Sequence, residues 1–485
     1  MKQTQNVWYL KNVLRLTGAA PVCVALLLAS CATKPNVYKN IDGEVDAAAF
    51  DKAIAEIEAS EAVPEGKKAP KNPVYGEKNT ILLSLDKGIL EHYAGRYEAS
   101  YKDLTDAERK IEEAYTKSLS QDISSYVAND NTKDYAGEDY EDVYVNIFNA
   151  LNAYHLNNGQ ALALINDLTA QGGELQVLAD KYAEDNSKVK EFLGSTLKVA
   201  GTVFSIGTVE WPAVADVTFT NSALARYLAA VFYLADGNKD SARYNLFELQ
   251  NAFTTPVYEG FGVPASLAVT GERGSETGPI LDIPAGKGQL NVLAFSGLSP
   301  IKVEKVENIL LPFLQTVTLK TGKVKVPDLR ERPSAISSVS VSVQGGPSFD
   351  LELLENIGAV LTDTFKGHQS SVYLKTFTRV LAKYIVADIA ATKAVKEAVD
   401  NGKNQLLAIS AGAGIALFAK KGLDATEAAD IRSARYLPAK AYVGAVNLDP
   451  GNYTISVNYA GGTSSTHNVA IKPGAISLVE AVCLK

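Results

Sequence analysis

The sequence predicts an α+β protein in which a helical array precedes a β-rich end. From residue 80 to 253, Ala, Leu and Tyr recur three and four residues apart, which is the spacing of helices with one buried face. From residue 440 onward, apolar and polar residues alternate between turns rich in Pro, Gly and Asn, which is typical of antiparallel strands. Both patterns occur between these regions. We therefore expect a tetratricopeptide-like helical array, a central mixed α/β segment and a small C-terminal antiparallel β-domain.

The length of 485 residues is enough for two or three domains. Composition changes near residue 254, where Gly, Pro, Thr and Ser become frequent, and we place a boundary there. The expected segments are a lipoprotein signal peptide (1–30), a lipidated tether with a first helix (31–79), a tetratricopeptide-like helical domain (80–253), a mixed strand and helix domain (254–439) and a β-sandwich-like tail (440–485).

The first 30 residues have the layout of a secretory signal. Residues 1–18 carry three basic residues and no acidic one, and residues 19–30 are apolar and end in small side chains. The apolar run is too short to span a bilayer. It ends in Leu-Ala-Ser before Cys31, which resembles a bacterial lipobox, so we expect cleavage before Cys31 and attachment of lipid, including palmitate, to its thiol. The alternative is an ordinary signal peptide with an incidental cysteine. Ala32, rather than an aspartate, favours the outer membrane.

Charge and cysteine content narrow the class of protein. The net charge is −8, and removal of the signal peptide with its three basic residues makes it −11. This acidity argues against nucleic acid or anionic lipid as a partner. Once Cys31 is acylated, Cys483 is left without a partner, which excludes a disulfide framework. Cys483 stands in the apolar run SLVEAVCL, so we expect it to be a small buried side chain.

Two stretches of the helical domain have the small-residue and aromatic spacing of a tetratricopeptide repeat. They are residues 84–107 and 226–249, and a shorter, degenerate version lies at 146–168. In such a repeat, small residues let two helices approach and an aromatic side chain fills the gap between them. The alternative is a set of generic helical hairpins with the same spacing. The expected repeat-core residues are Gly88, Gly95, Tyr97, Ala107, Tyr233, Gly237 and Ala242.

The mixed segment is expected to alternate between strands and helices. An uncharged run at 404–419 is too short to be a typical membrane-spanning helix. We therefore expect a buried helix whose Ala and Gly allow close packing, and contact with a membrane is the alternative. The other expected elements are strands at 289–296, 314–320 and 334–344 and helices at 350–366 and 371–400.

No motif in the chain marks a reaction, a cofactor or a metal ion. There is no nucleophile elbow, no complete phosphate-binding loop and no complete dinucleotide loop. The histidines lack partners at metal-ligand spacing, so we expect them on the surface or in hairpins. Acidic residues between 130 and 142 do not match a calcium-binding EF-hand loop and are read as the solvated start of a helix. The residues considered are the histidines His92, His155, His368 and His467 and the acids Asp130, Asp134, Glu138 and Glu141.

The stretch ADIRSARYLP precedes the C-terminal strands and concentrates charge. Arg432 and Arg435 are placed to pair with Asp430 or Glu427 and to join the helical part to the β-domain. The alternative is a pair of arginines that binds a carboxylate or a glycan.

Several stretches together resemble an uncharacterised family of bacterial envelope lipoproteins. They are the lipobox, YAGEDYEDV (135–143), LSPIKVEKV (298–306), FTRVLAKY (377–384) and ADIRSARYLPAKAYVG (429–444), followed by DPGNYTISV. The resemblance implies tetratricopeptide-like N-terminal helices, a small C-terminal β-domain and no established reaction. Some related lipoproteins with helical repeats support cell-wall synthases.

Three hypotheses for function follow. The first is a periplasm-facing, outer-membrane lipoprotein that binds an envelope protein through its helical repeats, with no catalytic residue, cofactor or nucleic acid partner. The second is an accessory lipoprotein for the assembly of peptidoglycan or surface polysaccharide. The third is a hydrolase with an unrecognised carboxylate site. The oligomeric state is left open.

Overall fold

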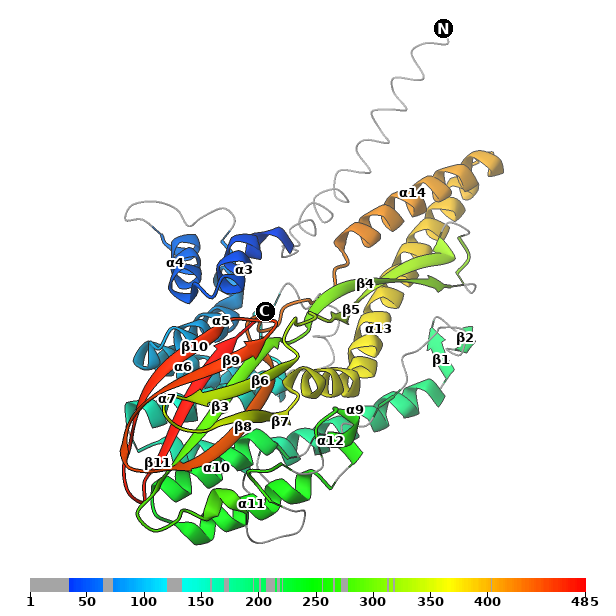
Figure 1. Ribbon diagram of the computed structural model, residues 1–485. Helices are drawn as coiled ribbons and strands as arrows, with labels where there is room; N and C mark the ends of the chain where they lie inside the picture. Colours follow the sequence, from blue (N-terminus) through cyan, green and yellow to red (C-terminus); the bar gives the residue numbers. More distant parts are fainter. Residues whose placement is uncertain are drawn as a thin grey trace.

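Helical hairpins pack against one face of a curled β-sheet, and an arm of two helices and two strands projects from this body (Figure 1). The computed structural model describes residues 35–485 except 64–72, 120–132, 158, 170–173, 195, 200–201, 206–213, 216–218, 220, 255, 265–266, 272–277, 312–313, 317–318 and 403. The predicted fold class, mixed α+β with C-terminal strands, is confirmed.

Three helical hairpins follow one another along the first half of the chain. They are α5 with α6, α7 with α8, and α10 with α11, and each turns at a glycine with positive φ: Gly95 (72°), Gly159 (76°) and Gly237 (78°). Glycine suits these positions because side chains disfavour positive φ. The helices of this half are α3 (Lys39–Asp46), α4 (Phe50–Glu61), α5 (Thr80–Tyr93), α6 (Tyr97–Leu119), α7 (Asp139–Leu156), α8 (Ala161–Thr169), α9 (Glu174–Gly194), α10 (Ala223–Ala235), α11 (Lys239–Ala252) and α12 (Pro256–Gly260), with the 3₁₀ turns η1 (Pro35–Tyr38), η2 (Glu77–Asn79) and η5 (Pro279–Leu281).

Three of the seven expected repeat-core residues, Gly88, Ala107 and Ala242, lie where the two helices of a hairpin meet, and Gly95 and Gly237 form the turns. A Cβ added at Gly88 would lie 2.7 Å from the side chain of Leu104, so α5 and α6 approach closely there. Ala107 and Ala242 are fully buried. Tyr233 is half-buried, and its hydroxyl accepts a hydrogen bond from Asn166 of α8 (2.8 Å). Tyr97 is only half-buried: its ring lies edge-on to His92 of α5, with centroids 5.4 Å apart, and also faces the cleft described below, so it fills the joint between α5 and α6 only in part.

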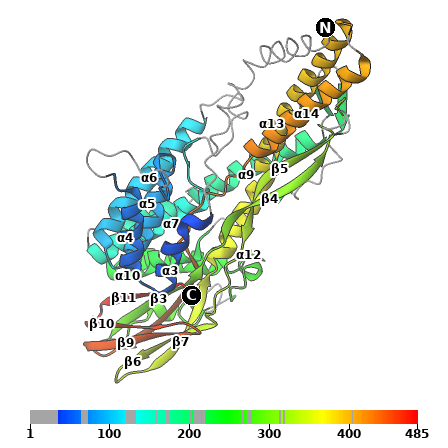
Figure 2. The ribbon, with the colours of Figure 1, turned by 90° about the horizontal axis from the view of Figure 1, so that it is seen from above.

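Seven strands form the main sheet, in the order β10-β9-β6-β7-β8-β3-β11. All neighbours are antiparallel except β11 and β3. The sheet curls, so its two end strands β10 and β11 lie side by side (Figures 1 and 2). The strands are β3 (Gly288–Leu298), β6 (Ser338–Val343), β7 (Ser348–Glu355), β8 (Pro438–Leu448), β9 (Gly451–Ala460), β10 (Ser464–Ile471) and β11 (Ile476–Cys483).

The tail beyond residue 440 is therefore not a separate domain. Its strands share one sheet with β3, β6 and β7, which come from the segment predicted as a mixed domain. The reason lies in β3, which is buried along nearly its whole length and needs neighbours on both sides. β8 and β11 supply them. Cys483 is 3 % exposed inside the curled sheet, as expected of a small buried side chain.

The arm consists of the ribbon β4 (Ile301–Leu310) and β5 (Thr321–Arg330) packed on the helices α13 (Ile357–Asp400) and α14 (Gln405–Thr426) (Figure 2). A second small ribbon pairs β1 (Thr196–Val199) with β2 (Thr202–Ser205). The arm has a core of its own, formed by apolar side chains of β4, β5, α13 and the turn between the strands.

Several expectations for the mixed segment were wrong. The expected strand at 314–320 lies between β4 and β5, where the carboxylate of Asp388 accepts hydrogen bonds from the backbone N–H groups of Gln315 (3.0 Å) and Thr316 (2.8 Å). The expected helix at 350–366 begins only at Ile357, after β7, because the Asn356 side chain caps it there. It then continues without a break to Asp400, so two expected helices are one.

The sheet covers the inner face of the helical hairpins. Phe148 on α7 packs on Phe295 of β3 with ring centroids 5.4 Å apart. The hydroxyl of Tyr227 on α10 donates to Asn291 of β3 at 2.9 Å. The concave face that a repeat array offers to a partner is thus filled by strands of the same chain. This arrangement argues against the helical groove as the binding surface.

Candidate functional site

A cleft of about 650 Å³ opens where the first helical hairpin meets the two end strands of the sheet. Its volume lies in the range typical of ligand sites. The α3–α4 turn, the α5–α6 turn, β10 and β11 each form one wall. The lining residues are Ala48, Ala49, Phe50, Asp51, Lys52, His92, Tyr93, Ala94, Gly95, Tyr97, Ser465, His467, Glu480, Ala481 and Val482.

Glu480 of β11 joins two histidines at the inner end of the cleft. Its Oε1 lies 2.6 Å from Nε2 of His92, in the last turn of α5, and its Oε2 lies 2.9 Å from Nε2 of His155, in the last turn of α7. The His92 side chain is 2 % exposed and that of Glu480 is 9 % exposed. The cluster therefore ties two helical hairpins to the edge of the sheet.

A chain of hydrogen bonds determines the protonation of His92. The Ser100 hydroxyl donates to the backbone oxygen of Gly88 (2.7 Å), so it accepts from the amide nitrogen of Asn152 (2.8 Å). The amide oxygen of Asn152 then faces Nδ1 of His92 at 2.7 Å and must accept from it. Since Nε2 of His92 faces a carboxylate, both ring nitrogens donate, and His92 is an imidazolium.

Electrostatics agree with that assignment. Burial alone would lower the pKa of His92, but the carboxylate of Glu480 and the hydrogen bonds to Glu480 and Asn152 raise it above its usual value. Burial alone would raise the pKa of Glu480, yet the charge of His92 and the hydrogen bonds from both histidines hold it well below its usual range. Because both carboxylate oxygens are occupied and its basicity is low, Glu480 is a poor general base.

Aromatic rings form one side of the cleft. The ring of Tyr97 stacks on His155 with centroids 4.2 Å apart and planes 9° apart. Phe50 and Tyr93 lie beside it, with centroids 5.4 Å apart. Tyr97 contacts His92 within its own hairpin and His155 of the next hairpin, and it is half-buried because its ring also faces the cleft. Such a platform can bind the flat face of a ligand.

The opposite side combines polar side chains with a strained turn. On β10, Oγ of Ser465 lies 2.8 Å from Nε2 of His467, and burial lowers the pKa of His467. Ala48, between α3 and α4, has a φ of 54°, which is uncommon for alanine. Strain of this kind is frequent at binding sites.

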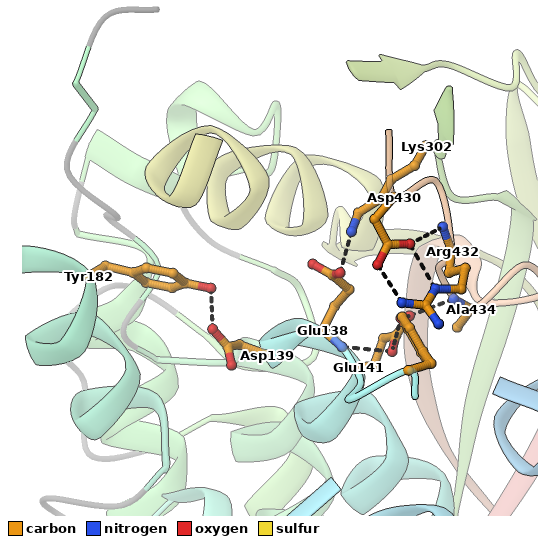
Figure 3. A network of polar contacts seen from close by, with 9 residues as sticks. Glu138, Asp139, Glu141, Tyr182, Lys302, Asp430, Arg432 and Ala434 are labelled. Atoms are coloured by element: carbon orange, nitrogen blue, oxygen red, sulfur yellow. Dashed lines mark hydrogen bonds and ion pairs between the residues drawn. The ribbon is translucent and has the colours of Figure 1, made fainter. Parts of the chain in front are cut away.

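Asp430, Arg432 and Arg435 lie in a connector (427–437) and do not line this cleft, and both arginines form ion pairs. Arg432 Nη2 lies 2.6 Å from Oδ2 of Asp430 (Figure 3), and its guanidinium lies over the ring of Tyr135. Arg435 binds Asp42 of α3, with Nε 2.7 Å from Oδ1. The arginines thus join the connector to the N-terminal part of the chain.

Glu427 is not a partner of these arginines, contrary to one of the expected pairings. It instead forms ion pairs with Arg379 and Lys383 of α13. Its side chain is 2 % exposed, so these two cations compensate a carboxylate that is almost fully removed from water.

The acidic start of α7 is only partly solvated, because Asp134 is exposed and Glu138 is half-buried, whereas Glu141 is 1 % exposed. Glu138 forms an ion pair with Lys302 of β4, and Glu141 accepts a hydrogen bond from the backbone N–H of Ala434 (2.5 Å), as Figure 3 shows. Glu141 also accepts a hydrogen bond from the Tyr135 hydroxyl (2.8 Å). Burial raises the pKa of Glu141 to about 8. Asp130 lies outside the described residues. Within the described part of the chain, no group of three or more acidic, histidine or cysteine side chains is arranged to hold a metal ion.

His92 and His155 lie in helical hairpins, as expected, but His92 is buried rather than exposed, and His155, His368 and His467 are half-buried. A signal for two of them exists in the sequence. His92 and His155 stand three and four residues before the turn glycines Gly95 and Gly159, in matching places of successive hairpins. Glu480 is a lone charge inside an apolar strand, and such a charge needs a partner.

Comparison with protein-family models, curated proteins and solved structures gave no match. The site is therefore interpreted from its own geometry. None of the described helices has the length and apolar character needed to cross a membrane.

Proposed function

We propose that this chain is a lipid-anchored envelope protein that binds another envelope protein without catalysing a reaction. The anchor is Cys31, and the expected location is the periplasmic side of the outer membrane, in keeping with the lipobox-like sequence and the resemblance to envelope lipoproteins. The binding site is the cleft between the α5–α6 hairpin and strands β10 and β11.

The observation that carries this proposal is that the two end strands of the sheet, β10 and β11, lie side by side at the cleft. These strands end the hydrogen-bonded order of the sheet, so each has an edge without a ladder partner among the described strands. An extended peptide can bind such an edge by main-chain hydrogen bonds, while pockets select its side chains. Here the cleft adjoins both edges, and Tyr97, Phe50 and Val482 supply apolar contacts for the peptide.

A second candidate is a glycan, which would suit an accessory role in the assembly of peptidoglycan or surface polysaccharide. The stacked pair of Tyr97 and His155 favours it, because aromatic faces bind the apolar faces of sugar rings. Ser465 and His467 offer hydrogen bonds on the opposite wall.

The two candidates are separated by crosslinking at the cleft. A photoreactive phenylalanine in place of Tyr97 is expected to form an adduct in intact cells, and the same residue in place of Tyr244 on α11, which is 54 % exposed, is expected to form none. A protease-sensitive partner supports the peptide-binding function, and a partner released by a peptidoglycan hydrolase or glycosidase supports the second. Equal adducts at both positions would refute the cleft as the binding site.

Anchoring is expected to depend on the thiol of Cys31. In a Cys31→Ser variant the hydroxyl cannot accept the thioether-linked lipid, so the precursor remains uncleaved and unlabelled by palmitate. A Cys483→Ser variant is the matched control and should be labelled and processed as the unaltered chain is. Because such lipoproteins carry two or three acyl chains, the unaltered protein should stay with the membrane after a salt wash. Palmitate labelling of the Cys31→Ser variant at the level of the unaltered protein would contradict the anchor.

A further inference from the structure

Exposed apolar side chains are concentrated on the arm. Among the described residues, thirteen large apolar side chains are exposed, and nine of them belong to β4, α13 or α14. Clusters of this kind mark interaction surfaces, whereas single exposed apolar residues do not. The six that cover the outer part of the helical hairpin are Val386, Ile389, Leu407, Ile409, Ile415 and Leu417.

α14 packs with its small residues and exposes its large ones. Ala408, Gly412 and Ala416 are buried, and a Cβ at Gly412 would lie 2.2 Å from the side chain of Val395 on α13. Leu407 is 66 % exposed and Ile409 is 52 % exposed. The expectation that 404–419 forms a buried helix was therefore wrong, although its small residues do allow close packing.

The length of this surface is suited to lying on a membrane. Residues 404–419 contain no charged side chain. As a helix they extend about 24 Å, which is shorter than the hydrocarbon core of a bilayer at about 30 Å. An apolar helix of this length that is exposed at the surface fits the boundary between lipid headgroups and acyl chains.

The charge of the arm differs in sign from that of the chain. β4, β5, α13 and α14 together contain 13 Lys and Arg against 8 Asp and Glu, whereas the whole chain has 47 against 55. Lys393 and Lys396 lie on α13 near the outer end of the hairpin. A basic arm on an acidic protein complements a surface of anionic phospholipid.

The anchor brings this arm to a bilayer. Cys31 precedes Pro35, the first residue of η1, by four residues, and four residues reach at most about 14 Å. The lipid would thus hold η1 and α3 close to the membrane. In Figure 1, α3, α4 and the outer end of α14 lie toward the upper end of the molecule, and α10 and α11 lie at the lower end.

We propose that the outer end of the α13–α14 hairpin docks on the surface of a phospholipid bilayer, as a second and non-covalent attachment beside the lipid at Cys31. The placement of the hairpin rests on the proposed anchor, but its affinity for lipid rests on its own side chains. The lipid anchor and the docking of the hairpin are therefore tested separately.

The test places a lipid-sensitive fluorophore on the arm of the full chain. Leu407→Cys is the reporter and Tyr244→Cys is the matched control, both exposed in the structure. Both chains carry Cys23→Ser and Cys31→Ser, so the anchor is absent and the leader is the same in each; Cys483 is buried. Vesicles of phosphatidylethanolamine and phosphatidylglycerol are expected to shift the emission of the label at 407 to the blue and to leave the label at 244 unchanged. Adding Ile409→Glu and Ile415→Glu is expected to weaken the response at 407 about tenfold or more.

Two outcomes overturn the proposal. The first is an equal response at both positions, or none at 407. The second is a blue shift at 407 that needs no vesicles and grows with protein concentration, which would identify the hairpin as a contact between two copies of the chain. If palmitate fails to label the unaltered protein but the label at 407 still responds to vesicles, the anchor fails and the docking surface stands.

Discussion

Replacing Glu480 by alanine is expected to lower the free energy of unfolding by on the order of 3–5 kcal/mol, because it leaves the imidazolium of His92 buried without its counter-charge. The Nε2 atoms of His92 and His155 lie 2.6 and 2.9 Å from the carboxylate oxygens, so one substitution removes the ionic contacts of both histidines with β11. Denaturant unfolding, followed by circular dichroism, measures the loss.

The control is Glu397→Ala on the arm. Glu397 is 64 % exposed and lies 3.8 Å from Lys393, and such surface pairs contribute about 0–1 kcal/mol. In Glu480→Ala, the pKa of His92 should also fall, as seen by NMR titration, since the carboxylate that raises it is gone. If Glu480→Ala were as stable as Glu397→Ala, the cluster of His92, His155 and Glu480 would have to be solvated.

The parts of the fold that were predicted correctly depend on local patterns. The turn glycines at 95 and 237 and the small residues at 88, 107 and 242 reflect contacts within one hairpin, so they can be found from spacing alone. The pairing of β3 with β8 and β11 joins residues 140 to 187 positions apart in sequence, and alternation within a strand carries no information about its neighbour. That is why the tail was taken for a separate domain.

The cleft could not be predicted for the same reason. Its side chains come from the α3–α4 turn, the α5–α6 turn and the last two strands, which are brought together only by the curled sheet. The arginines of the connector could be identified from the sequence because three charged residues lie within six positions. The partner of Arg435, Asp42, could not, since it is almost 400 positions away. The exposure of α14 was missed because an uncharged sequence suits a buried helix and a membrane-facing one equally well.

Asp86 is expected to make a contribution to stability that is lost as the pH rises. Asp86 is fully buried in α5, where it accepts hydrogen bonds from the Tyr75 hydroxyl (2.9 Å) and the backbone N–H of Arg435 (2.6 Å). Burial outweighs these bonds and raises its pKa to about 7. The folded state thus holds a proton that the unfolded chain, with a pKa of about 3.9, has lost, so the favourable contribution disappears between about pH 4 and pH 7. Between pH 5 and pH 8 the loss amounts to about 2–3 kcal/mol.

An Asp86→Asn variant keeps the shape of this side chain but cannot titrate, so the difference in stability between the variant and the unaltered protein should shift by about 2–3 kcal/mol in favour of the variant between pH 5 and pH 8. Asp449→Asn, whose side chain is 77 % exposed, is the control and should follow the unaltered protein at every pH. Glu141 and His92, whose pKa values are also raised, lower the stability of all three chains as the pH rises, whereas His368 and His467, whose pKa values burial lowers, increase it. These contributions are common to the three chains, so the comparison between them isolates Asp86. Parallel curves for Asp86→Asn and the unaltered protein would mean that Asp86 is ionised in the folded state throughout this range. Its two hydrogen bonds, rather than its burial, would then determine its charge.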